Sequence, residues 1–487
     1  MKSLKDILYG VGLSAVSGTT SVMVNNICFD SRKVGVDDVF VAIKGLVADG
    51  HQFIEQTVAS GARAVICEEL PRQMEDGVTY VVVDNANSAL AIMAANFYNN
   101  PSKNLKLVGI TGTNGKTTIS SLLYQLFTKA GYKVGLISTI KIMVDKTEYP
   151  TTHTTPDALT INKYLGLMSE AGVEYCFMEV SSHGISQKRT EGLTFEGAIF
   201  TNLSHDHLDY HKTFAEYRDT KKLLFDALTK RAFALTNVDD KNGLVMLQNT
   251  KARKYTYALK SYADYRGQIL EKQFNGQLLK IDDNELWSKL IGDFNAYNML
   301  AIYGAADLLG LEKLETLRLL SELENVDGRF QYYISKENIT AIVDYAHTPD
   351  ALKNVLETIG TLRTGNENVI TVVGCGGDRD KSKRPVMGHI ASSLSNKVIF
   401  TSDNPRSESP TLIMEEMEAG VEPQHVKKIL SIENRKQAIK TACQLAAAKD
   451  IILVAGKGHE TYQETKGVRE DFDDYKMVKE LLESLGK

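Results

Sequence analysis

The segment KLVGITGTNGKTTISSLLYQLFTKAG, from Lys106 to Gly131, decides the fold of the central part of the chain. Its first six residues have the apolar character of a buried strand, and the glycine-containing loop GTNGK follows at once. Beyond the loop, apolar residues recur at the spacing of one helical face, at Ile119, Leu122, Leu123, Leu126 and Phe127. Gly131 marks the end of the predicted helix. This order of strand, loop and amphipathic helix predicts a unit of a parallel α/β sheet.

The loop between this strand and helix is predicted to hold the phosphates of ATP. Its backbone N–H groups, with the helix N-terminus behind them, would form an anion-binding nest. Lys116 can reach the β- and γ-phosphates, and the Thr117 hydroxyl can ligate Mg²⁺. Ile110 stands where the standard GxxxxGK[ST] motif has its first glycine. A chance GKT in a surface turn is the alternative, and the flanking strand and helix argue against it. The predicted loop comprises Gly112, Thr113, Asn114, Gly115, Lys116, Thr117 and Thr118.

Composition and charge exclude several classes of protein. Hydrophobic residues make up 43% and charged residues 24% of the chain, as in ordinary globular proteins. The formal net charge of −5 gives no electrostatic basis for nucleic-acid binding, and no apolar run reaches the roughly 18 residues of a membrane helix. Five cysteines without ligand-like spacing suit a reducing cytoplasm. We expect a cytoplasmic monomer that binds neither nucleic acid nor membrane.

The length of 487 residues indicates about three domains. Residues 1–103 hold short strand-like runs such as VFVAIKG and end near the turn signal Asn100-Pro101. Residues 104–325 alternate buried strands with helix-length stretches, which predicts a parallel sheet, and residues near 250–290 suggest a less regular, partly antiparallel insert. Residues 326–487 carry the strand candidates TAIVDYAH, VITVVGCGGD, KVIFTSDNPR and DIILVAGKGHE. The predicted fold class is α/β, with a second doubly wound unit at the C-terminal end.

Acidic and imidazole side chains follow two strands of the predicted central sheet. Glu179 ends the strand YCFME, and His207 lies in the run SHDHLDYH after the strand GAIFTNL. The carboxyl ends of parallel strands meet at one edge, which is also the edge of the phosphate loop. Carboxylate and imidazole groups there could hold Mg²⁺ where charge builds up at the γ-phosphate. A purely structural role is the alternative for each residue.

Charged residues also follow the predicted strands of the last segment. Arg379 follows one strand in GCGGDRD, Arg406 follows the next in DNPR, and Glu460 follows the last in GKGHE. Ligands of open α/β sheets bind in such loops. Arginine suits a carboxylate, and an acid suits an amino group. The three residues together fit a substrate that carries both charges, although any one of them alone is as often a solvated surface charge.

Nine strings of the sequence together resemble those of the Mur ligase family. They are TGTNGKTT, MEVSSHGISQKR, TNLSHDHLDYH, EYRDTKKLLF, VDGRF, DYAHTPD, GCGGDRDKSKR, TSDNPRSE and AGKGHETY, and they cover nearly the whole chain. Within the family, the chain is most similar to the type that adds the third residue of the peptidoglycan stem. The resemblance implies a smaller α/β N-terminal domain for the UDP end of the acceptor, a central P-loop-type ATPase, and a C-terminal Rossmann-like domain for the incoming amino acid.

The resemblance also implies roles for single residues. The UDP-N-acetylmuramoyl dipeptide would contact Ser31, Thr154, Thr155, Ser181, Gln187 and Arg189. Asn295 and Arg329 match positions near the nucleotide. Lys221, which has Lys222 as its neighbour, matches the lysine that the family carbamylates. As a carbamate it would join Thr117, Glu179 and His207 as a metal ligand. The incoming amino acid would contact Arg379, Asp403, Asn404, Pro405, Arg406, Gly456 and Glu460.

Together these roles predict an ATP- and Mg²⁺-dependent amide ligase of peptidoglycan precursor synthesis. The D-Glu carboxylate of UDP-N-acetylmuramoyl-L-Ala-D-Glu would attack ATP to form an acyl phosphate, with Lys116, Glu179, His207 and Lys221 as the catalytic group. The amine of meso-diaminopimelate, which the DNPR string indicates, would then displace phosphate. An L-lysine-adding ligase is one alternative, and a folylpolyglutamate synthetase-type ligase is another, although DNPR and GCGGDRD count against it. A P-loop switch without ligase activity is the alternative from a different class.

Overall fold

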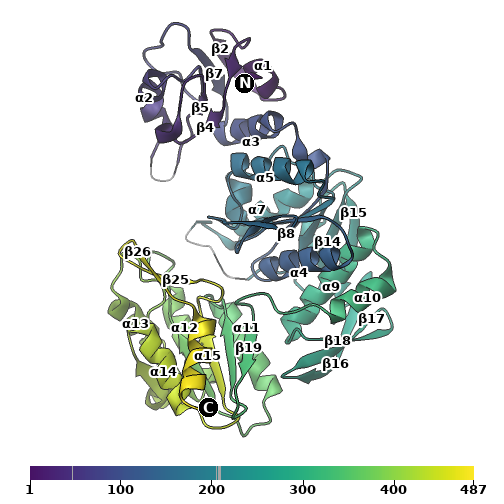
Figure 1. Ribbon diagram of the computed structural model, residues 1–487, viewed down its shortest axis with the longest axis vertical. Coiled ribbons are helices and arrows are strands. Elements are labelled where there is room, and N and C mark those ends of the chain that lie inside the picture. The colour runs from purple at the N-terminus through teal and green to yellow at the C-terminus, as the bar shows by residue number, and fades with distance from the viewer. Residues whose placement is uncertain (46–47, 205, 207–209) are drawn as a thin grey trace.

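The computed structural model describes residues 1–45, 48–204, 206 and 210–487. Three α/β bodies follow one another along the chain, and each is built on a sheet of its own (Figure 1). The N-terminal body lies at one end, the central body lies in the middle, and the C-terminal body folds beside the central one. The α/β fold class predicted from the sequence is confirmed.

The N-terminal body contains a five-stranded sheet of order β2-β7-β6-β5-β4, in which β2 is antiparallel to its neighbour and the others are parallel. A two-stranded ribbon of β1 and β3 lies beside it. The elements are β1 (Lys2–Ser3), α1 (Leu4–Ile7), β2 (Leu13–Ser17), β3 (Met23–Val24), β4 (Ile27–Cys28), η1 (Ser31–Lys33), β5 (Val39–Val41), η2 (Gly50–Phe53), α2 (Ile54–Ala59), β6 (Ala64–Cys67), β7 (Thr79–Val83), α3 (Ala86–Phe97) and η3 (Pro101–Lys103).

The central body is organised around an eleven-stranded sheet of order β11-β10-β9-β12-β8-β13-β14-β15-β16-β17-β18. Strands from β9 to β16 in this order are parallel. Its strands are β8 (Lys106–Thr111), β9 (Val134–Ile137), β10 (Ile142–Val144), β11 (Thr147–Tyr149), β12 (Tyr175–Glu179), β13 (Gly197–Phe200), β14 (Phe233–Asn237), β15 (Arg253–Ala258), β16 (Tyr265–Gln273), β17 (Gly276–Ile281) and β18 (Asn284–Ser288). Its helices are α4 (Lys116–Lys129), α5 (Ala158–Glu170), α6 (Ser182–Ser186), α7 (Phe214–Asp226), α8 (Gly243–Met246), α9 (Asp293–Leu308) and α10 (Lys313–Ser321).

The predicted strand, loop and helix of residues 106–131 are confirmed. All five apolar residues of the predicted helical face are fully buried in α4, and Gly131 follows the helix in a left-handed conformation with φ of 92°. The prediction of a less regular, partly antiparallel segment at residues 250–290 is confirmed in its strand directions. Strands β15 and β16 are parallel, whereas β16, β17 and β18 form an antiparallel meander with a register shift between Ile269 and Glu271. This meander extends the central sheet and is not a separate insert. The turn Asp282-Asp283, which has positive φ angles at both residues, connects β17 to β18.

The C-terminal body contains a six-stranded sheet of order β19-β20-β24-β21-β22-β23, parallel except for β19. The hairpin of β25 and β26 lies over its carboxyl edge. The elements are β19 (Gln331–Ile334), β20 (Thr340–Asp344), α11 (Pro349–Leu362), β21 (Val369–Val373), α12 (Lys383–Leu394), β22 (Lys397–Phe400), α13 (Pro410–Glu418), η4 (Pro423–Lys428), β23 (Ile429–Ser431), α14 (Arg435–Leu445), β24 (Ile451–Ala455), β25 (Tyr462–Thr465), β26 (Val468–Asp471) and α15 (Asp474–Ser484).

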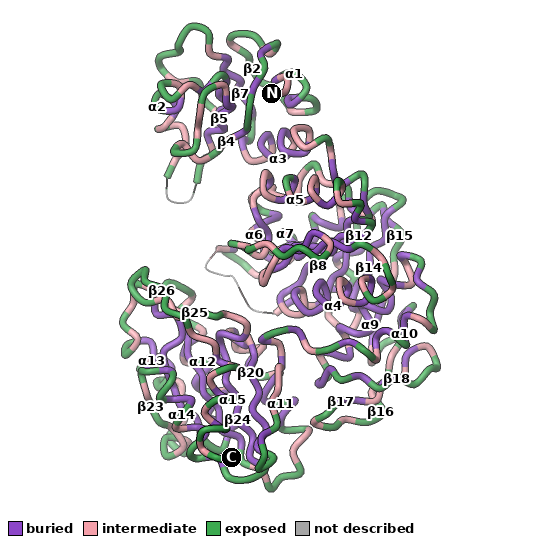
Figure 2. The backbone as a smooth tube through the Cα atoms, viewed as in Figure 1, coloured by how far each residue is buried: buried purple, intermediate pink, exposed green. Residues whose placement is uncertain are grey.

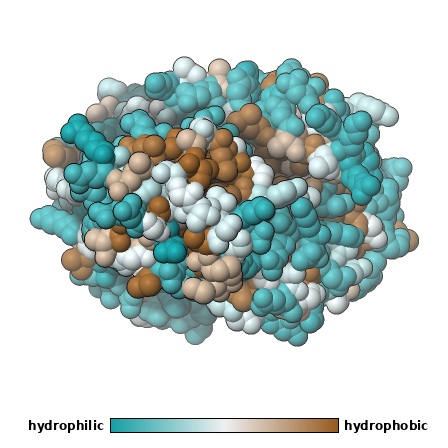
Figure 3. Space-filling view, turned by 90° about the horizontal axis from the view of Figure 1, so that it is seen from above, coloured by the Kyte–Doolittle hydropathy of each residue, from teal (hydrophilic) through white to brown (hydrophobic). Residues whose placement is uncertain are grey.

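Buried residues concentrate along the sheets and on the helix faces that cover them (Figure 2). Separate clusters of apolar side chains fill the two faces of the central sheet and the two faces of the C-terminal sheet. Figure 3 shows that hydrophilic side chains cover much of the face seen from above, with a group of hydrophobic ones among them. Among the described helices, none combines the length and apolar character of a membrane span. Each body therefore has its own core, and polar loops are left at the sheet edges.

Candidate active site

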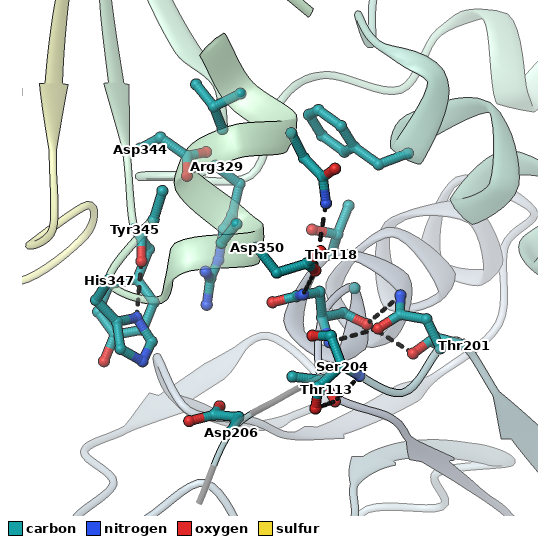
Figure 4. A pocket seen from close by; sticks show the side chains of 18 of the residues that line it. Thr113, Thr118, Thr201, Ser204, Asp206, Arg329, Asp344, Tyr345, His347 and Asp350 are labelled. Carbon is teal, nitrogen blue, oxygen red and sulfur yellow. Dashed lines mark hydrogen bonds between the residues drawn. The ribbon is translucent and has the colours of Figure 1, made fainter. Parts of the chain in front are cut away.

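A cleft of about 1360 Å³ lies between the central and C-terminal bodies. The carboxyl ends of strands in both sheets open into it, so it collects loops from both bodies. Figure 4 shows Arg329, Tyr345, His347 and Asp350 of the C-terminal side facing Thr113 and other residues of the central body. The arrangement brings the predicted phosphate loop and the predicted amino-acid loops to one space.

The phosphate loop between β8 and α4 depends on two glycines. Gly112 and Gly115 have φ angles of 149° and 88°. A Cβ atom at Gly112 would lie 1.9 Å from Thr201 Oγ1, and one at Gly115 would lie 2.7 Å from Asn298 Oδ1. The loop therefore packs closely against β13 and α9, and no larger residue fits at either position. Asn114 N donates to Asn202 Oδ1 at 2.9 Å, which fixes the middle of the loop.

Lys116 curls back over the loop that it follows. Its Nζ donates to Gly112 O at 2.9 Å and to Thr113 O at 2.8 Å. Burial lowers its pKa, and the nearby Glu179 carboxylate opposes this shift. The ammonium group thus already lies where the loop would cradle phosphate oxygens, which are stronger acceptors than these carbonyls.

A chain of hydroxyl groups connects the phosphate loop to Glu179, whose side chain is fully buried. Thr117 Oγ1 donates to Glu179 Oε2 at 3.0 Å. Thr139 donates to the same carboxylate twice, from N to Oε1 at 2.7 Å and from Oγ1 to Oε2 at 3.1 Å. Thr139 Oγ1 also lies 3.0 Å from Thr154 Oγ1, a residue predicted to bind the acceptor. Glu179 is therefore positioned between the nucleotide loop and the expected acceptor site.

The neighbouring lysines Lys221 and Lys222 have different environments on α7. Lys221 Nζ donates to Gly112 O at 3.0 Å and lies 4.6 Å from the centre of the Tyr217 ring. Burial, reinforced by the Lys116 charge, holds the pKa of Lys221 well below its usual value. Lys222 instead pairs with Asp226 at 2.7 Å. The geometry therefore places Lys221 at the phosphate loop, in an environment that favours its neutral amine.

The predicted ligand His207 lies outside the described residues, while Asp206 of the same run lines the cleft. Within the described part of the chain, no group of three or more His, Cys, Asp or Glu side chains is arranged to hold a metal ion. Thr117 and Glu179 nevertheless provide adjacent oxygen donors at the phosphate loop. Oxygen donors of this kind fit Mg²⁺, which usually takes only one or two carboxylates from the protein.

Two contacts across the cleft connect the phosphate loop to the C-terminal body. Arg329 Nη2 donates to Thr117 Oγ1 at 3.2 Å, and the guanidinium group lies 4.5 Å from the centre of the Tyr345 ring. Asn114 Nδ2 donates to Asp350 Oδ2 at 3.1 Å at the start of α11. Arg329, predicted to lie near the nucleotide, is thus in the cleft beside the loop.

Asn295, the other residue expected near the nucleotide, is 3% exposed and lies behind the cleft wall. Its Nδ2 donates to Ile291 O at 2.8 Å, and its Oδ1 accepts from Asn298 Nδ2 at 3.0 Å. Asn298 is the residue that lines the cleft and contacts Gly115. The structure therefore gives Asn295 a supporting contact to Asn298.

A second cavity of about 650 Å³ lies between the N-terminal and central bodies. Ser31, Gln187 and Arg189, which the resemblance implies would contact the acceptor, line it. Arg189 donates to Gln187 Oε1 from Nη2 at 2.6 Å and to Thr155 O from Nη1 at 2.6 Å. Thr155 Oγ1 donates to Glu179 O at 2.9 Å. These contacts form a continuous path from the second cavity to Glu179.

Ser181 lies on this path, at the start of α6. Its side chain caps the helix by accepting from Gly184 N at 3.1 Å, and its N donates to Thr155 Oγ1 at 2.9 Å. The expected acceptor-binding residues of the central body therefore lie along one connected strip, and Ser31 lies at the cavity at its end.

The predicted amino-acid loops converge on the C-terminal side of the large cleft. Its lining includes Arg379, Asp403, Asn404, Arg406, Gly456 and Glu460. Pro405 continues the loop, and its O accepts from Glu408 N at 3.0 Å. Arg406 has a φ of 50°, and its Nη1 donates to Gly377 O at 2.7 Å, which joins the DNPR loop to the GCGGDRD loop. The pocket combines two cationic and two acidic side chains.

Buried polar side chains support these loops from behind. Arg384, with a fully buried side chain, pairs with Glu408 at 2.9 Å and with Glu416 at 2.7 Å. Asp344, at the end of β20, accepts from Phe330 N at 2.7 Å, and burial raises its pKa to about 6. Burial also lowers the pKa of His347 to about 4. Titratable side chains beneath the loops are thus buried and held by specific partners.

Three family models match successive parts of the sequence. Residues 23–98 match the Mur ligase family catalytic domain, residues 110–306 match the Mur ligase middle domain, and residues 328–458 match the Mur ligase glutamate ligase domain. The chain belongs to the Mur ligase family. The resemblance seen in the sequence is confirmed, and as a member of this family the chain is an ATP-dependent ligase.

Individual Mur ligases match over the full length. The UDP-N-acetylmuramoyl-L-alanyl-D-glutamate–2,6-diaminopimelate ligase of Cytophaga hutchinsonii is 55% identical over 485 residues, which cover 99% of this chain and 100% of that protein. The ligase of the same name from Phocaeicola vulgatus is 52% identical and covers 98% of this chain and 99% of its own. A solved structure of a ligase with this name is 32% identical, has a TM-score of 0.69, and covers 100% of this chain and 99% of its own.

Sequence reasoning missed several residues that line the cleft of this Mur ligase. Thr139 follows β9 at the same sheet edge as Glu179, so the rule that placed Glu179 there could have found it. His347 and Asp350 lie within the quoted string DYAHTPD, which was assigned no residue roles. Asn298 gave no signal, because a buried asparagine inside an apolar helix is indistinguishable in sequence from a structural one.

Proposed function

We propose that this Mur ligase adds meso-diaminopimelate to the D-Glu carboxylate of UDP-N-acetylmuramoyl-L-Ala-D-Glu, with ATP as the phosphoryl donor. Full-length relatives at 55% and 52% identity carry the name of this activity. The observation that carries the proposal is that one cleft has the phosphate loop on one side and Arg406, Asp403 and Glu460 on the other. Meso-diaminopimelate has a distal ammonium and a distal carboxylate, which this mixture of charges matches. L-Lysine lacks the distal carboxylate and would leave Arg406 unmatched.

In the first step, an oxygen of the D-Glu carboxylate attacks the γ-phosphorus, the bond to ADP breaks, and an acyl phosphate forms. The phosphates enter the loop, and their oxygens replace the carbonyls of Gly112 and Thr113 as acceptors for Lys116. Arg329, already in contact with Thr117, brings a second cation to the same place. Fixed cations where charge develops lower the barrier most in a buried site.

Mg²⁺ belongs to this proposal as a cofactor held by oxygen donors of the chain. Thr117 and Glu179 fit it, and a carbamate on Lys221 would add a further oxygen. The carbamate would form when the neutral amine of Lys221, which its environment favours, adds to CO₂ and loses a proton. His207 completes the proposed ligand set. When bound, Mg²⁺ supplies positive charge that offsets the charge of the phosphates.

In the second step, the amine of meso-diaminopimelate attacks the carbonyl carbon of the acyl phosphate. The bond to the phosphate oxygen breaks, phosphate leaves, and the amine loses a proton as the amide forms. The residues that bind the amino acid and those that bind ATP lie on opposite walls, joined by the Asn114–Asp350 contact. Closed walls around the intermediate limit attack by water.

Phosphate release with purified protein, ATP, Mg²⁺, the UDP-muramoyl dipeptide and either meso-diaminopimelate or L-lysine tests the proposal. We expect release that depends on meso-diaminopimelate, and we expect Lys116→Met to reduce it by at least about 100-fold. Lys251→Met, at an exposed lysine of the same body, is the matched control and should retain activity. Release that ignores the amino acid would instead support a P-loop switch, and greater activity with L-lysine would support the lysine-adding alternative.

A further inference from the structure

We infer that Lys457 is a positioning residue of the amino-acid pocket: its buried ammonium group holds Asn404 and Glu460 in the orientation that receives the distal ammonium group of the incoming amino acid. The inference rests on the proposed function, because it names how that pocket is built. Asn404 and Glu460 line the cleft, whereas the Lys457 side chain is 0% exposed. Lys457 therefore acts through its neighbours.

The contacts of Lys457 are directed at these two residues. Its Nζ lies 3.0 Å from Asn404 Oδ1 and 3.0 Å from Glu460 Oε2. The centre of the Tyr462 ring lies 5.4 Å from the same nitrogen. Gly456 and Gly458, on either side, have φ angles of 115° and 52°, and this left-handed backbone turns the lysine side chain inward. A buried lysine with this set of partners is fixed in position.

Lys457 settles which end of the Asn404 amide faces Glu460. Asn404 Oδ1 is approached by Lys457 Nζ and, at 2.9 Å, by Glu464 N. Both groups can only donate, so the atom between them must be the oxygen. Asn404 Nδ2 is then the end that lies 2.7 Å from Glu460 Oε2. Glu460 thus has Oε2 committed to Lys457 and Asn404, which orients its carboxylate relative to the cleft.

Lys457 also offsets the repulsion between two acids. Burial and the nearby Asp403 carboxylate raise the pKa of Glu460, and Lys457 opposes this rise. Asp403 Oδ2 is buried and accepts no hydrogen bond from the described residues. Other titratable groups that interact electrostatically with Glu460 include Tyr345, Arg435, Tyr462 and Arg469. Lys457 therefore favours the ionised form of Glu460, which can present its charge to an ammonium group.

The test compares two substrates in the Lys457→Met variant, which keeps the methylene chain and removes the charge. Meso-diaminopimelate carries the distal ammonium, and L-2-aminopimelate lacks it but keeps both carboxylates. We expect kcat/KM for meso-diaminopimelate to fall about 10- to 100-fold, mainly through KM, as for loss of a charge-assisted hydrogen bond. For L-2-aminopimelate we expect less than about a threefold change. KM for ATP should stay within about twofold, and Lys440→Met on the exposed face of α14 is the control.

A second background shows whether the effect passes through Glu460. In Glu460→Gln, addition of Lys457→Met should produce little further loss for meso-diaminopimelate, because the partner is already neutral. If Lys457→Met does not fold, Lys457→Gln replaces it, since glutamine keeps a donor for Asn404. In Lys457→Met or Lys457→Gln with Glu460 unchanged, the acid limb of the pH profile of kcat/KM should move to higher pH, because loss of the cation raises the pKa of Glu460.

Equal losses for the two amino acids, an equal rise in KM for all substrates, or an undiminished effect in the Glu460→Gln background would each overturn the inference. An unmoved acid limb would do the same. Failure of the proposed function looks different, because the unmodified protein would then show no phosphate release that depends on meso-diaminopimelate.

Discussion

Asp474→Asn is expected to destabilise the C-terminal body and weaken binding of the amino acid. Asp474 and Arg435 are both fully buried and joined by two hydrogen bonds, Nε to Oδ1 at 2.8 Å and Nη2 to Oδ2 at 2.7 Å. The same guanidinium group donates to Ala455 O at 3.1 Å and to Ser402 O at 3.4 Å. These two carbonyls immediately precede Gly456 and Asp403. The ion pair therefore supports the ends of two strands that carry pocket loops.

The magnitude follows from the burial of the pair. Substitution by asparagine keeps the shape of the side chain but leaves the Arg435 charge without a compensating carboxylate. Breaking a buried pair from one side costs about 3–5 kcal/mol. For a body of this size each kcal/mol lowers the transition temperature by about 2–4 °C, so we expect a drop of about 6–20 °C.

Differential scanning calorimetry of the full chain measures this drop, and KM for meso-diaminopimelate measures the effect on the pocket. We expect KM for the amino acid to rise more than KM for ATP, because Arg435 supports only the C-terminal loops. Asp471→Asn, at an exposed carboxylate of β26, is the charge-matched control. A transition temperature of Asp474→Asn equal to that of the control would refute the reasoning.

Two further predictions test the pocket and its pH dependence. Gly456→Ala should raise KM for meso-diaminopimelate about 10-fold or more, because Gly456 has a φ of 115° and a Cβ atom would lie 2.5 Å from Asp403 Oδ2. Gly467→Ala, with a φ of 79° and open space around it, is the control in the same assay, and equal effects would contradict the role of the contact. The raised pKa of Asp344 means that the folded protein keeps a proton that the unfolded chain releases, so this contribution to stability is present at low pH and is lost as pH rises through about 6. In Asp344→Asn the unfolding free energy, measured by denaturant titration from pH 4 to pH 7, should lose this fall of up to about 3 kcal/mol, and an unchanged pH dependence would exclude Asp344 as its source.

The parts of the fold that sequence predicted best are those where local pattern and tertiary packing agree. The apolar stripe of α4 is an example, because helical spacing alone decides which face is buried. The sequence gives only a weak signal for the strands of the antiparallel meander β16–β18, because they lack apolar runs and one face is open to solvent. Its pairing depends on the turn at Asp282 and on the edge offered by β15, which only the folded sheet reveals.

The same contrast holds for the candidate site. The phosphate loop could be predicted because its residues are contiguous and each has a local reason to be there. The choice between Lys221 and Lys222 could not be made from physical pattern, because both lie on one helix and only the packing of α7 decides which reaches Gly112. Thr139 could have been found from its place at the end of β9, but Asn298 contacts a loop far away in the chain, so no local pattern marks it.

The buried cations beneath the C-terminal loops have a consequence for how substrate preference changes during evolution or engineering. Arg384, Arg435 and Lys457 are each fully buried, and each pairs with a carboxylate. A graft of Arg406 alone into a lysine-using scaffold would bring the recognising group without the supports that hold its loop. A change in preference for the third stem residue should therefore require two sets of residues to change together: those that contact the amino acid, and the buried cations that support their loops.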